Sequence, residues 1–126
     1  VLLRQTLLRQ IFKFHGAEHK AVNYYQADCQ GELSSYPRLA RRCGTNLIVV
    51  YLFLLVLVHF LGWRANVYLQ SLLLLGIAYE ILLFLPTSLL SIPFLLQRFT
   101  TIEPDNKQLK AARMALEVLI KKENQK

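Results

Sequence analysis

Two imidazoles and a carboxylate fall within five residues of the sequence, in the stretch FHGAEHK at residues 14–20. His15, Glu18 and His19 form an H-x-x-E-H arrangement, the inverse of the more common order in zinc proteases. Side chains four residues apart stack on one face of a helix, so His15 and His19 can bind one metal ion from two directions. Glu18 lies between them and could accept a proton from water. The stretch predicts a site for zinc or another divalent metal, with Glu18 as the general base.

A metal ion needs at least a third ligand, and two residues near the ends of apolar runs are candidates. Cys43 directly precedes the first run, and Glu80 lies inside the second, five residues before Leu85, or about 8 Å along a helix. An ionisable group within such a run is usually functional. We therefore expect Cys43 or Glu80 to join the histidine pair. His59 lies about 20 Å along the first run and is expected to be too distant, and Cys29 is given no role.

Two apolar runs must position these residues, NLIVVYLFLLVLVHFLG at 46–62 and VYLQSLLLLGIAYEILLFL at 67–85. The chain is 54% hydrophobic, and this content is clustered rather than spread as in a soluble core. A helix needs roughly 17–25 apolar residues to cross a bilayer, so each run can span one. The sequence predicts an all-α integral membrane protein, built on a two-span helical hairpin.

The segments before and after the hairpin read as amphipathic helices. In residues 1–26 one stripe is expected to be buried, and cationic residues are expected to face solvent on the other side. The stripe consists of Leu8, Ile11, His15, Glu18 and Val22, and the cations are Arg9, Lys13 and Lys20. Residues 86–99 are predicted to form an interfacial or re-entrant segment. Pro104 is expected to open a tail helix whose inner face is formed by Leu109, Ala112, Leu116, Leu119 and Ile120.

The 126 residues are expected to form one membrane domain, with a cytoplasmic helix and loop at 1–45 and a cytoplasmic tail helix at 100–126. The loop, 27–45, is polar and irregular, with room for one short helical turn. Since the chain does not begin with Met, we expect that N-terminal sequence is missing.

The distribution of positive charge predicts the orientation in the membrane. The 15 Lys and Arg residues lie almost entirely before the first run or after the second, and the turn between the runs holds only Arg64. The positive-inside rule then makes both termini cytoplasmic, in a multi-pass protein of the inner (plasma) membrane. The same flanking charges explain the net charge of +7 without nucleic acid as a partner.

A second polar stretch, QRFTTIEPDN at residues 97–106, lies near the predicted inner surface. Thr100, Thr101 and Glu103 could cap the tail helix. Glu103 could also serve as an extra metal ligand, and Gln97 and Thr101 are candidate supporting residues.

Four stretches together resemble the YqhQ-like family of bacterial membrane proteins, namely FHGAEHK at 14–20, RCGT at 42–45, YE at 79–80 and LQRFTTIEP at 96–104. That family has no established function and is described as predicted metal-dependent enzymes. The resemblance implies signature positions at His15, Glu18, His19, Cys43, Gly44, Glu80, Gln97, Thr101 and Glu103. The chain departs from the family where Ala40-Arg41-Arg42 replaces His-Pro-Arg, where Tyr24-Tyr25-Gln26 replaces Cys-Tyr-Glu, and in lacking a longer Gly-rich N-terminal region.

Two functions fit these observations. The first is a zinc-dependent hydrolase at the cytoplasmic membrane face, acting on a lipid or membrane peptide. The second is a small non-catalytic subunit or scaffold, in which the polar cluster is a hydrogen-bonded or metal-bound core. The lipid bilayer is a partner in both, and a larger membrane protein or a second copy of the chain is a further candidate.

Overall fold

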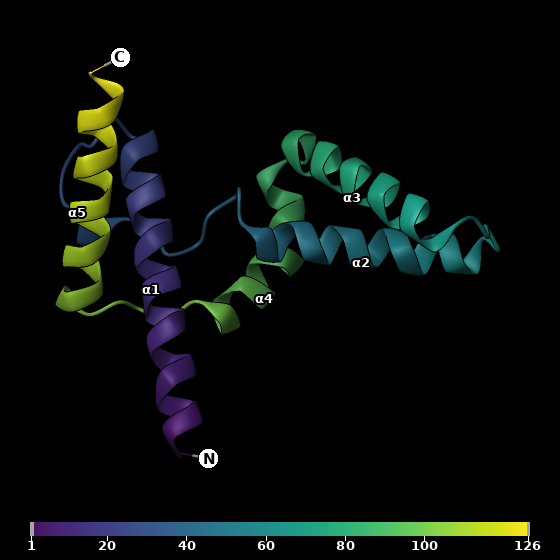
Figure 1. Cartoon of the computed structure of the whole chain (residues 1–126), viewed down its shortest axis with the longest axis horizontal. Coiled ribbons are helices and arrows are strands. Elements are labelled where there is room, and N and C mark those ends of the chain that lie inside the picture. The colour runs from purple at the N-terminus through teal and green to yellow at the C-terminus, as the bar shows by residue number, and fades with distance from the viewer. Residues whose placement is uncertain (1, 126) are drawn as a thin grey trace. The chain divides into compact units, whose positions relative to one another are not determined.

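The regular elements of the chain are helices joined by short loops (Figure 1). The computed structural model describes residues 2–125. The elements in chain order are α1 (Leu2–Gln26), the 3-10 helix η1 (Leu33–Ser35), α2 (Gly44–Phe60), α3 (Val67–Phe84), the 3-10 helix η2 (Thr87–Leu90), α4 (Ser91–Thr100) and α5 (Asn106–Glu123). Within the described range no strand occurs, which confirms the all-α prediction.

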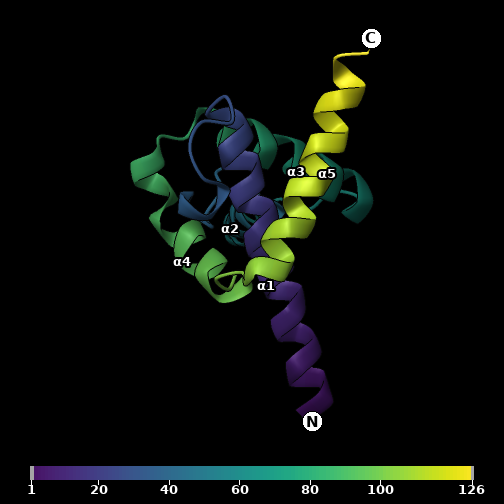
Figure 2. The ribbon, with the colours of Figure 1, turned by 90° about the vertical axis from the view of Figure 1, so that its left-hand side faces the viewer.

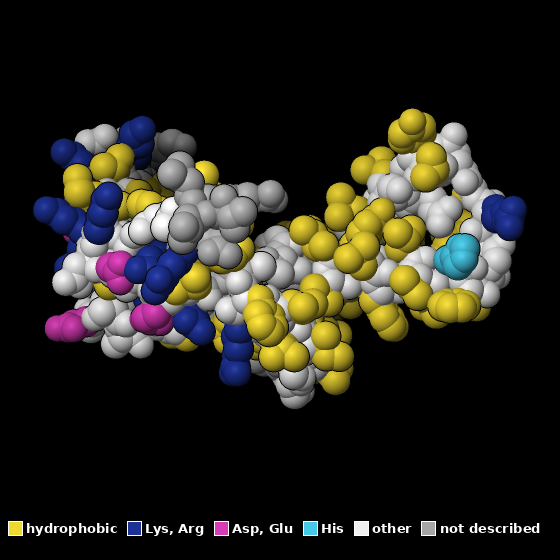
Figure 3. All heavy atoms as spheres, turned by 90° about the horizontal axis from the view of Figure 1, so that it is seen from below, with side chains coloured by type: hydrophobic (Ala, Val, Ile, Leu, Met, Phe, Trp, Pro, Cys, Tyr) yellow, Lys and Arg dark blue, Asp and Glu magenta, His cyan; other side chains and the backbone are white. Residues whose placement is uncertain are grey.

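These elements form two compact units. Unit 1 combines the chain up to Ala40 with the chain from Arg98 onward, so α1, η1 and α5 belong to it. Unit 2 is the intervening segment, Arg41–Gln97, and contains α2, α3, η2 and most of α4. The two units differ in surface chemistry: hydrophobic side chains predominate over unit 2, whereas Lys, Arg, Asp and Glu gather over unit 1 (Figure 3).

In unit 2, α2 and α3 form the predicted hairpin. Gly62, with a φ of +70°, ends α2 in a Schellman motif: its N–H donates to His59 O, and the Trp63 N–H donates to Val58 O. The Asn66 side chain then caps α3 by accepting from the N–H groups of Tyr68 and Leu69. The core is apolar and is formed by Val50, Ala78, Leu82 and Leu90, with Leu47, Tyr51, Leu54, Ile81, Leu85 and Phe94 around it.

The lengths of these helices bear on the membrane prediction. The 18-residue helix α3 is long and apolar enough to cross a membrane. The helix α2 has 17 residues and runs over 44–60 rather than 46–62, so it stays just below that length. By length and composition, α3 alone qualifies among the described helices. The two-span topology therefore stays a prediction.

In unit 1, α5 packs along α1 (Figures 1 and 2). The helix α5 begins at Asn106, and Asp105 caps it: Asp105 and Gln108 each bond the backbone of the other, as a capping box. Pro104 therefore precedes the cap and does not open the helix, and Thr100, Thr101 and Glu103 are not its cap. The capping role predicted for these residues was wrong because the prediction overlooked the Asp105-x-x-Gln108 pattern.

The prediction of which side of α1 is buried was also wrong. Leu8, Ile11, Glu18 and Val22 are exposed, and His15 is only partly buried. The buried face instead carries small residues, among them Gly16 and Ala17, together with cations, since Lys20 is 4% exposed. Small side chains let neighbouring backbone approach the helix closely, and the long stems of lysine can be buried when the ammonium finds acceptors.

Candidate metal centre

The two histidines of the H-x-x-E-H stretch lie side by side on α1. Their ring centroids are 4.3 Å apart, with the planes inclined by 66°. A ring nitrogen of His15 lies within 4.8 Å of one of His19. His19 is buried and His15 partly so. The spacing of four residues thus brings the two imidazoles together on one side of the helix, as predicted.

Each imidazole is held by a backbone carbonyl of unit 1. His15 Nδ1 donates to Thr100 O at 2.9 Å, and His19 Nδ1 donates to Arg38 O at 2.7 Å. A carbonyl oxygen can only accept, so Nδ1 carries the proton in both rings when neutral. The lone pair of each ring then resides on Nε2. Metal-binding histidines commonly donate their other ring N–H to a carbonyl or carboxylate, which fixes the tautomer and the direction of the ring.

The carbonyl that holds His15 belongs to a segment that lies directly against α1. The Ile102 N–H donates to Phe12 O at 3.0 Å. A Cβ at Gly16 would lie 2.3 Å from Ile102 O, closer than real Cβ atoms come to other atoms. Only glycine fits there, and its absence of a side chain lets this segment reach His15. In the sequence, Gly16 is only a glycine that follows His15, and nothing near it shows that Ile102 O will lie against it.

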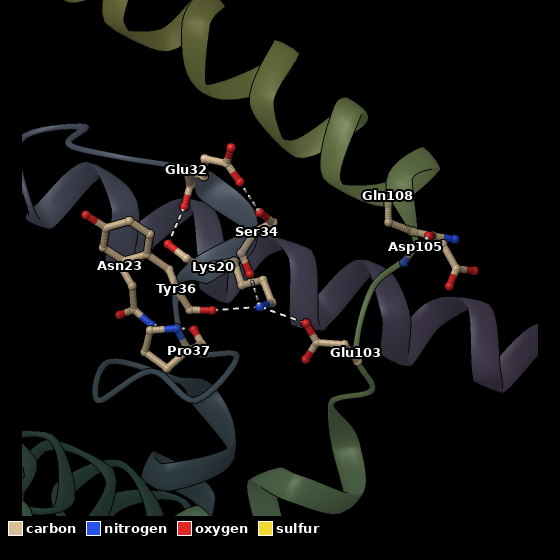
Figure 4. Close-up of polar contacts among 10 residues, drawn as sticks. Lys20, Asn23, Glu32, Ser34, Tyr36, Pro37, Glu103, Asp105 and Gln108 are labelled. Atoms are coloured by element: carbon tan, nitrogen blue, oxygen red, sulfur yellow. Dashed lines mark hydrogen bonds and ion pairs between the residues drawn. The ribbon is translucent and has the colours of Figure 1, made fainter.

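The carbonyl that holds His19 belongs to the loop after η1. Asn23, one helical turn beyond His19, donates from Nδ2 to Pro37 O at 2.8 Å (Figure 4) and to Leu39 O at 3.0 Å. Residues 37–39 therefore follow α1 with their carbonyls directed at its side chains. Asn23 was missed by the sequence reading because nothing in a polar loop shows which carbonyls will face a helix.

Glu18 lies on α1 between the histidines in sequence, but its side chain is exposed. Its carboxylate is therefore accessible to solvent. The candidate ligand Glu103 makes an ion pair with Lys20, with Oε1 2.8 Å from Nζ (Figure 4). Thr101, a candidate supporting residue, is buried.

The remaining candidates belong to unit 2. Cys43 is buried and caps α2, where its Sγ accepts from the Thr45 N–H at 3.4 Å. Glu80 is exposed on α3, in an apolar surface hollow with Leu73, Gly76 and Ile77. His59 is exposed near the end of α2. Cys43 and His59 thus lie at opposite ends of α2, and Glu80 lies on α3. The role of Cys43 or Glu80 as a ligand stays a prediction.

Gln97, the other supporting candidate, is part of a buried polar group in unit 2. Its Nε2 donates to Asn46 Oδ1 at 3.4 Å, and Asn46 Nδ2 donates to Arg41 O at 2.9 Å. The Arg41 guanidinium in turn donates to Leu83 O, at 3.0 Å, and to Leu85 O. Gln97 therefore has a packing role at one end of the hairpin.

Comparison with known proteins gives a family and a relative. A family model described as "Protein of unknown function (DUF1385)" matches residues 1–122. The chain is 29% identical over 136 aligned residues to a Bacillus subtilis (strain 168) protein described as "Uncharacterized protein YqhQ". The match covers 93% of this chain and 42% of the relative, so the chain spans less than half of the relative's length. No solved structure matches.

These matches bear out the resemblance seen in the sequence. They do not support the further expectation of a metal-dependent enzyme, since both descriptions leave the function open.

Proposed function

Since the chain belongs to the DUF1385 family, whose function is unknown, we propose from its own geometry that it binds a divalent transition-metal ion, most simply zinc, through Nε2 of His15 and His19. The observation that supports this most directly is the pair of hydrogen bonds from Nδ1 to Thr100 O and Arg38 O. Two neighbouring imidazoles with the same tautomer, each held by a carbonyl, have the arrangement that a metal centre requires of its ligands.

We propose Cys43 as the third ligand. A thiolate with two imidazoles is a donor set that zinc binds readily. The chain also allows it: Leu39 O is held beside α1 by Asn23, and the four residues that follow Leu39, ending at Cys43, reach at most about 14 Å. Glu80 is the competing candidate, and its position on an exposed face of α3 makes it the weaker one.

A site with three protein ligands leaves one position open, which is typical of catalytic rather than structural zinc. When bound, zinc would supply Lewis-acid chemistry and favour ionisation of water. The exposed Glu18 carboxylate is the base that we propose for removing a proton from that water. On this basis the reaction would be a hydrolysis, of a lipid or of a peptide at the membrane face.

We further propose that unit 2 inserts in a bilayer, with both termini on the cytoplasmic side. Large apolar side chains on α2 and α3 are exposed, including Phe53 at 65%, Phe60 at 83% and Phe84 at 82%. Lipid would cover such a surface, and at about 1.5 Å per residue α2 is roughly 25 Å long, close to the thickness of the hydrocarbon core. The same surface favours the alternative function, a non-catalytic subunit bound to a larger membrane protein.

The metal proposal is tested by the zinc content of the full chain, purified in mild detergent after zinc has been offered in excess. We expect about one zinc per chain in the wild type, and its loss in His19→Ala. His59→Ala is the matched control and should keep the metal. Absence of zinc from the wild type would overturn the proposal.

The same preparation tests the ligand, the base and the subunit alternative. Cys43→Ser should weaken binding more than Glu80→Gln or Cys29→Ser. Glu18→Gln should keep the metal and lose activity against candidate substrates. A fourth protein ligand in the X-ray absorption spectrum of the bound zinc would instead favour the non-catalytic subunit. Capture of a stoichiometric membrane partner would also support that alternative.

Insertion of unit 2 is tested with Trp63, the only tryptophan in the chain. It lies in the turn between α2 and α3, which the hairpin would carry to the far interface. Quenching of its fluorescence by brominated lipids in vesicles is expected. A spectrum that is insensitive to these lipids would contradict insertion.

A further inference from the structure

Lys20 is the most deeply buried cation among the described residues, and its contacts are specific (Figure 4). Its side chain is 5% exposed. The ammonium donates to Ser34 O and to Tyr36 O, each at 2.7 Å, and it pairs with Glu103 Oε1 at 2.8 Å. A lysine ammonium has three N–H donors, and these three contacts can use all of them.

These partners adjoin the two carbonyls that hold the histidines. Tyr36 lies two residues before Arg38, whose carbonyl accepts from His19. Glu103 lies three residues after Thr100, whose carbonyl accepts from His15. One ammonium therefore ties down both of the segments that direct the imidazoles, although the segments are more than sixty residues apart in sequence.

From this arrangement we propose that Lys20 is a positioning residue of the metal centre, which sets the direction of both imidazoles by holding the loop at 34–38 and the segment at 100–103 against α1. The inference rests on the proposed metal site and adds a residue that would not touch the metal. Residues of this kind, which orient the ligands, commonly change metal affinity by about 10–100-fold when they are replaced.

The charge itself supports a role in geometry. A buried ammonium loses its hydration and regains little net stability from its partners, so an apolar side chain of similar length would often serve packing equally well. What methionine cannot supply is three directed donors. The expected result of Lys20→Met is therefore a larger loss in metal binding than in folding.

Lys13 is the matched control. It also lies on α1, is largely buried (12% exposed), and pairs with a carboxylate of the chain after α4, that of Asp105. This partner of Lys13 lies outside the carbonyl-bearing loop at 34–38. Lys13→Met thus removes a similar charge and a similar ion pair while leaving the Lys20 contacts in place.

The test measures the affinity and the absorption spectrum of Co²⁺ bound to the full chain in detergent, since the spectrum reports the coordination geometry. We expect Lys20→Met to bind Co²⁺ about 10–100-fold more weakly and with an altered spectrum, while its helical circular dichroism matches that of Lys13→Met. If the wild type binds Co²⁺ and Lys20→Met binds it as tightly as Lys13→Met, with the same spectrum, the positioning role is overturned. If the wild type binds no metal, the proposed function itself has failed.

Two substitutions of Glu103 cover the case in which Lys20→Met does not fold. Glu103 is 62% exposed, so its replacement leaves packing intact. Glu103→Ala removes one of the three contacts of Lys20, whereas in Glu103→Gln the amide oxygen can still accept from Lys20. A positioning role predicts weaker Co²⁺ binding for Glu103→Ala and nearly normal binding for Glu103→Gln. Equal losses in both would show that the Glu103 carboxylate is a ligand, and normal binding in both would overturn the inference.

Discussion

The two units are both helical, but different forces hold each one together. In unit 1, four side chains of α1 donate to backbone carbonyls of other segments, those of His15, His19, Lys20 and Asn23. In unit 2, α2 and α3 meet through aliphatic side chains, and polar contacts occur mainly at one end of the hairpin. Hydrogen bonds are directional, whereas apolar packing tolerates small shifts. Unit 1 can therefore hold a precise arrangement of ligands, while unit 2 is suited to apolar surroundings.

The largest contrast is expected from adding one methyl group to a glycine in each unit. Alanine normally favours a helix over glycine by about 0.5–1 kcal/mol. At Gly16 the new Cβ would meet Ile102 O, so we expect Gly16→Ala to destabilise the chain by about 3 kcal/mol and to disturb the carbonyl beside His15. At Gly76 in α3 nothing lies within 4 Å, so Gly76→Ala should be neutral or slightly stabilising. Chemical unfolding followed by circular dichroism measures both, and an unaffected Gly16→Ala would mean that Ile102 does not cross α1 there.

A smaller contrast is expected from the asparagine that each unit uses to hold a carbonyl. Asn46 is fully buried, and Asn46→Ala would remove both its hydrogen bond with Gln97 and the one it donates to Arg41 O, at a cost of about 2 kcal/mol. Asn23 is partly exposed, and Asn23→Ala should cost about 1 kcal/mol. Unlike Asn46→Ala, it should release residues 37–39 and speed trypsin cleavage after Arg38. Equal cleavage rates in the two variants would contradict the role given to Asn23.

Arg41, at the end of the hairpin, offers an effect of about the same size as that of Asn23. Its guanidinium donates to Leu83 O, near the end of α3, and to Leu85 O, just after that helix. The carboxyl end of a helix also carries the negative end of its dipole. We expect Arg41→Met to lower the unfolding free energy by about 1 kcal/mol. Arg42→Met changes the neighbouring exposed arginine and should have little effect. Urea unfolding of the two variants in the same detergent gives the comparison, and identical midpoints would argue against the contact.

The smallest effect concerns a surface contact of unit 1. The Tyr25 hydroxyl donates to Glu123 Oε2 at 3.0 Å, and this hydrogen bond, together with the carboxylate's charge, raises the pKa of Tyr25 above its usual 10.0. The raised pKa favours the neutral phenol, so any stabilisation is present below pH 10 and is lost as the pH rises through the higher pKa. Glu123→Gln should lower this pKa. Ultraviolet titration against Tyr25→Phe measures it, and an unchanged curve would exclude the contact.

The sequence predicted much of the secondary structure, because long apolar runs and turn residues are local signals. The bounds of α2 differ from 46–62 by two residues, and a turn joins α2 to α3 as expected from the gap between the two apolar runs. The pairing of His15 with His19 followed from helical spacing alone. Each of these predictions needed only neighbouring residues.

The buried face of α1 could not be predicted in the same way. The hydrophobic pattern favoured the side of Ile11 and Val22, because a helix usually buries its aliphatic residues. The actual face is occupied by Lys13, Lys20 and Gly16, whose partners are carbonyls and carboxylates distant in sequence. A carbonyl is present at every residue, so composition cannot reveal which of them a lysine will meet.

Unit 1 combines a segment that precedes unit 2 with one that follows it, so the ribosome completes unit 1 only after it has made unit 2. His15 is synthesised early, but its carbonyl partner at Thr100 comes 85 residues later, after the whole of unit 2. Synthesis proceeds at about 5–20 residues per second, and contacts between distant residues form late. The hairpin is therefore complete before the first helix can acquire its final partners. A chain that stalls before residue 100 would display two imidazoles on α1 without the hydrogen bond that orients one of them.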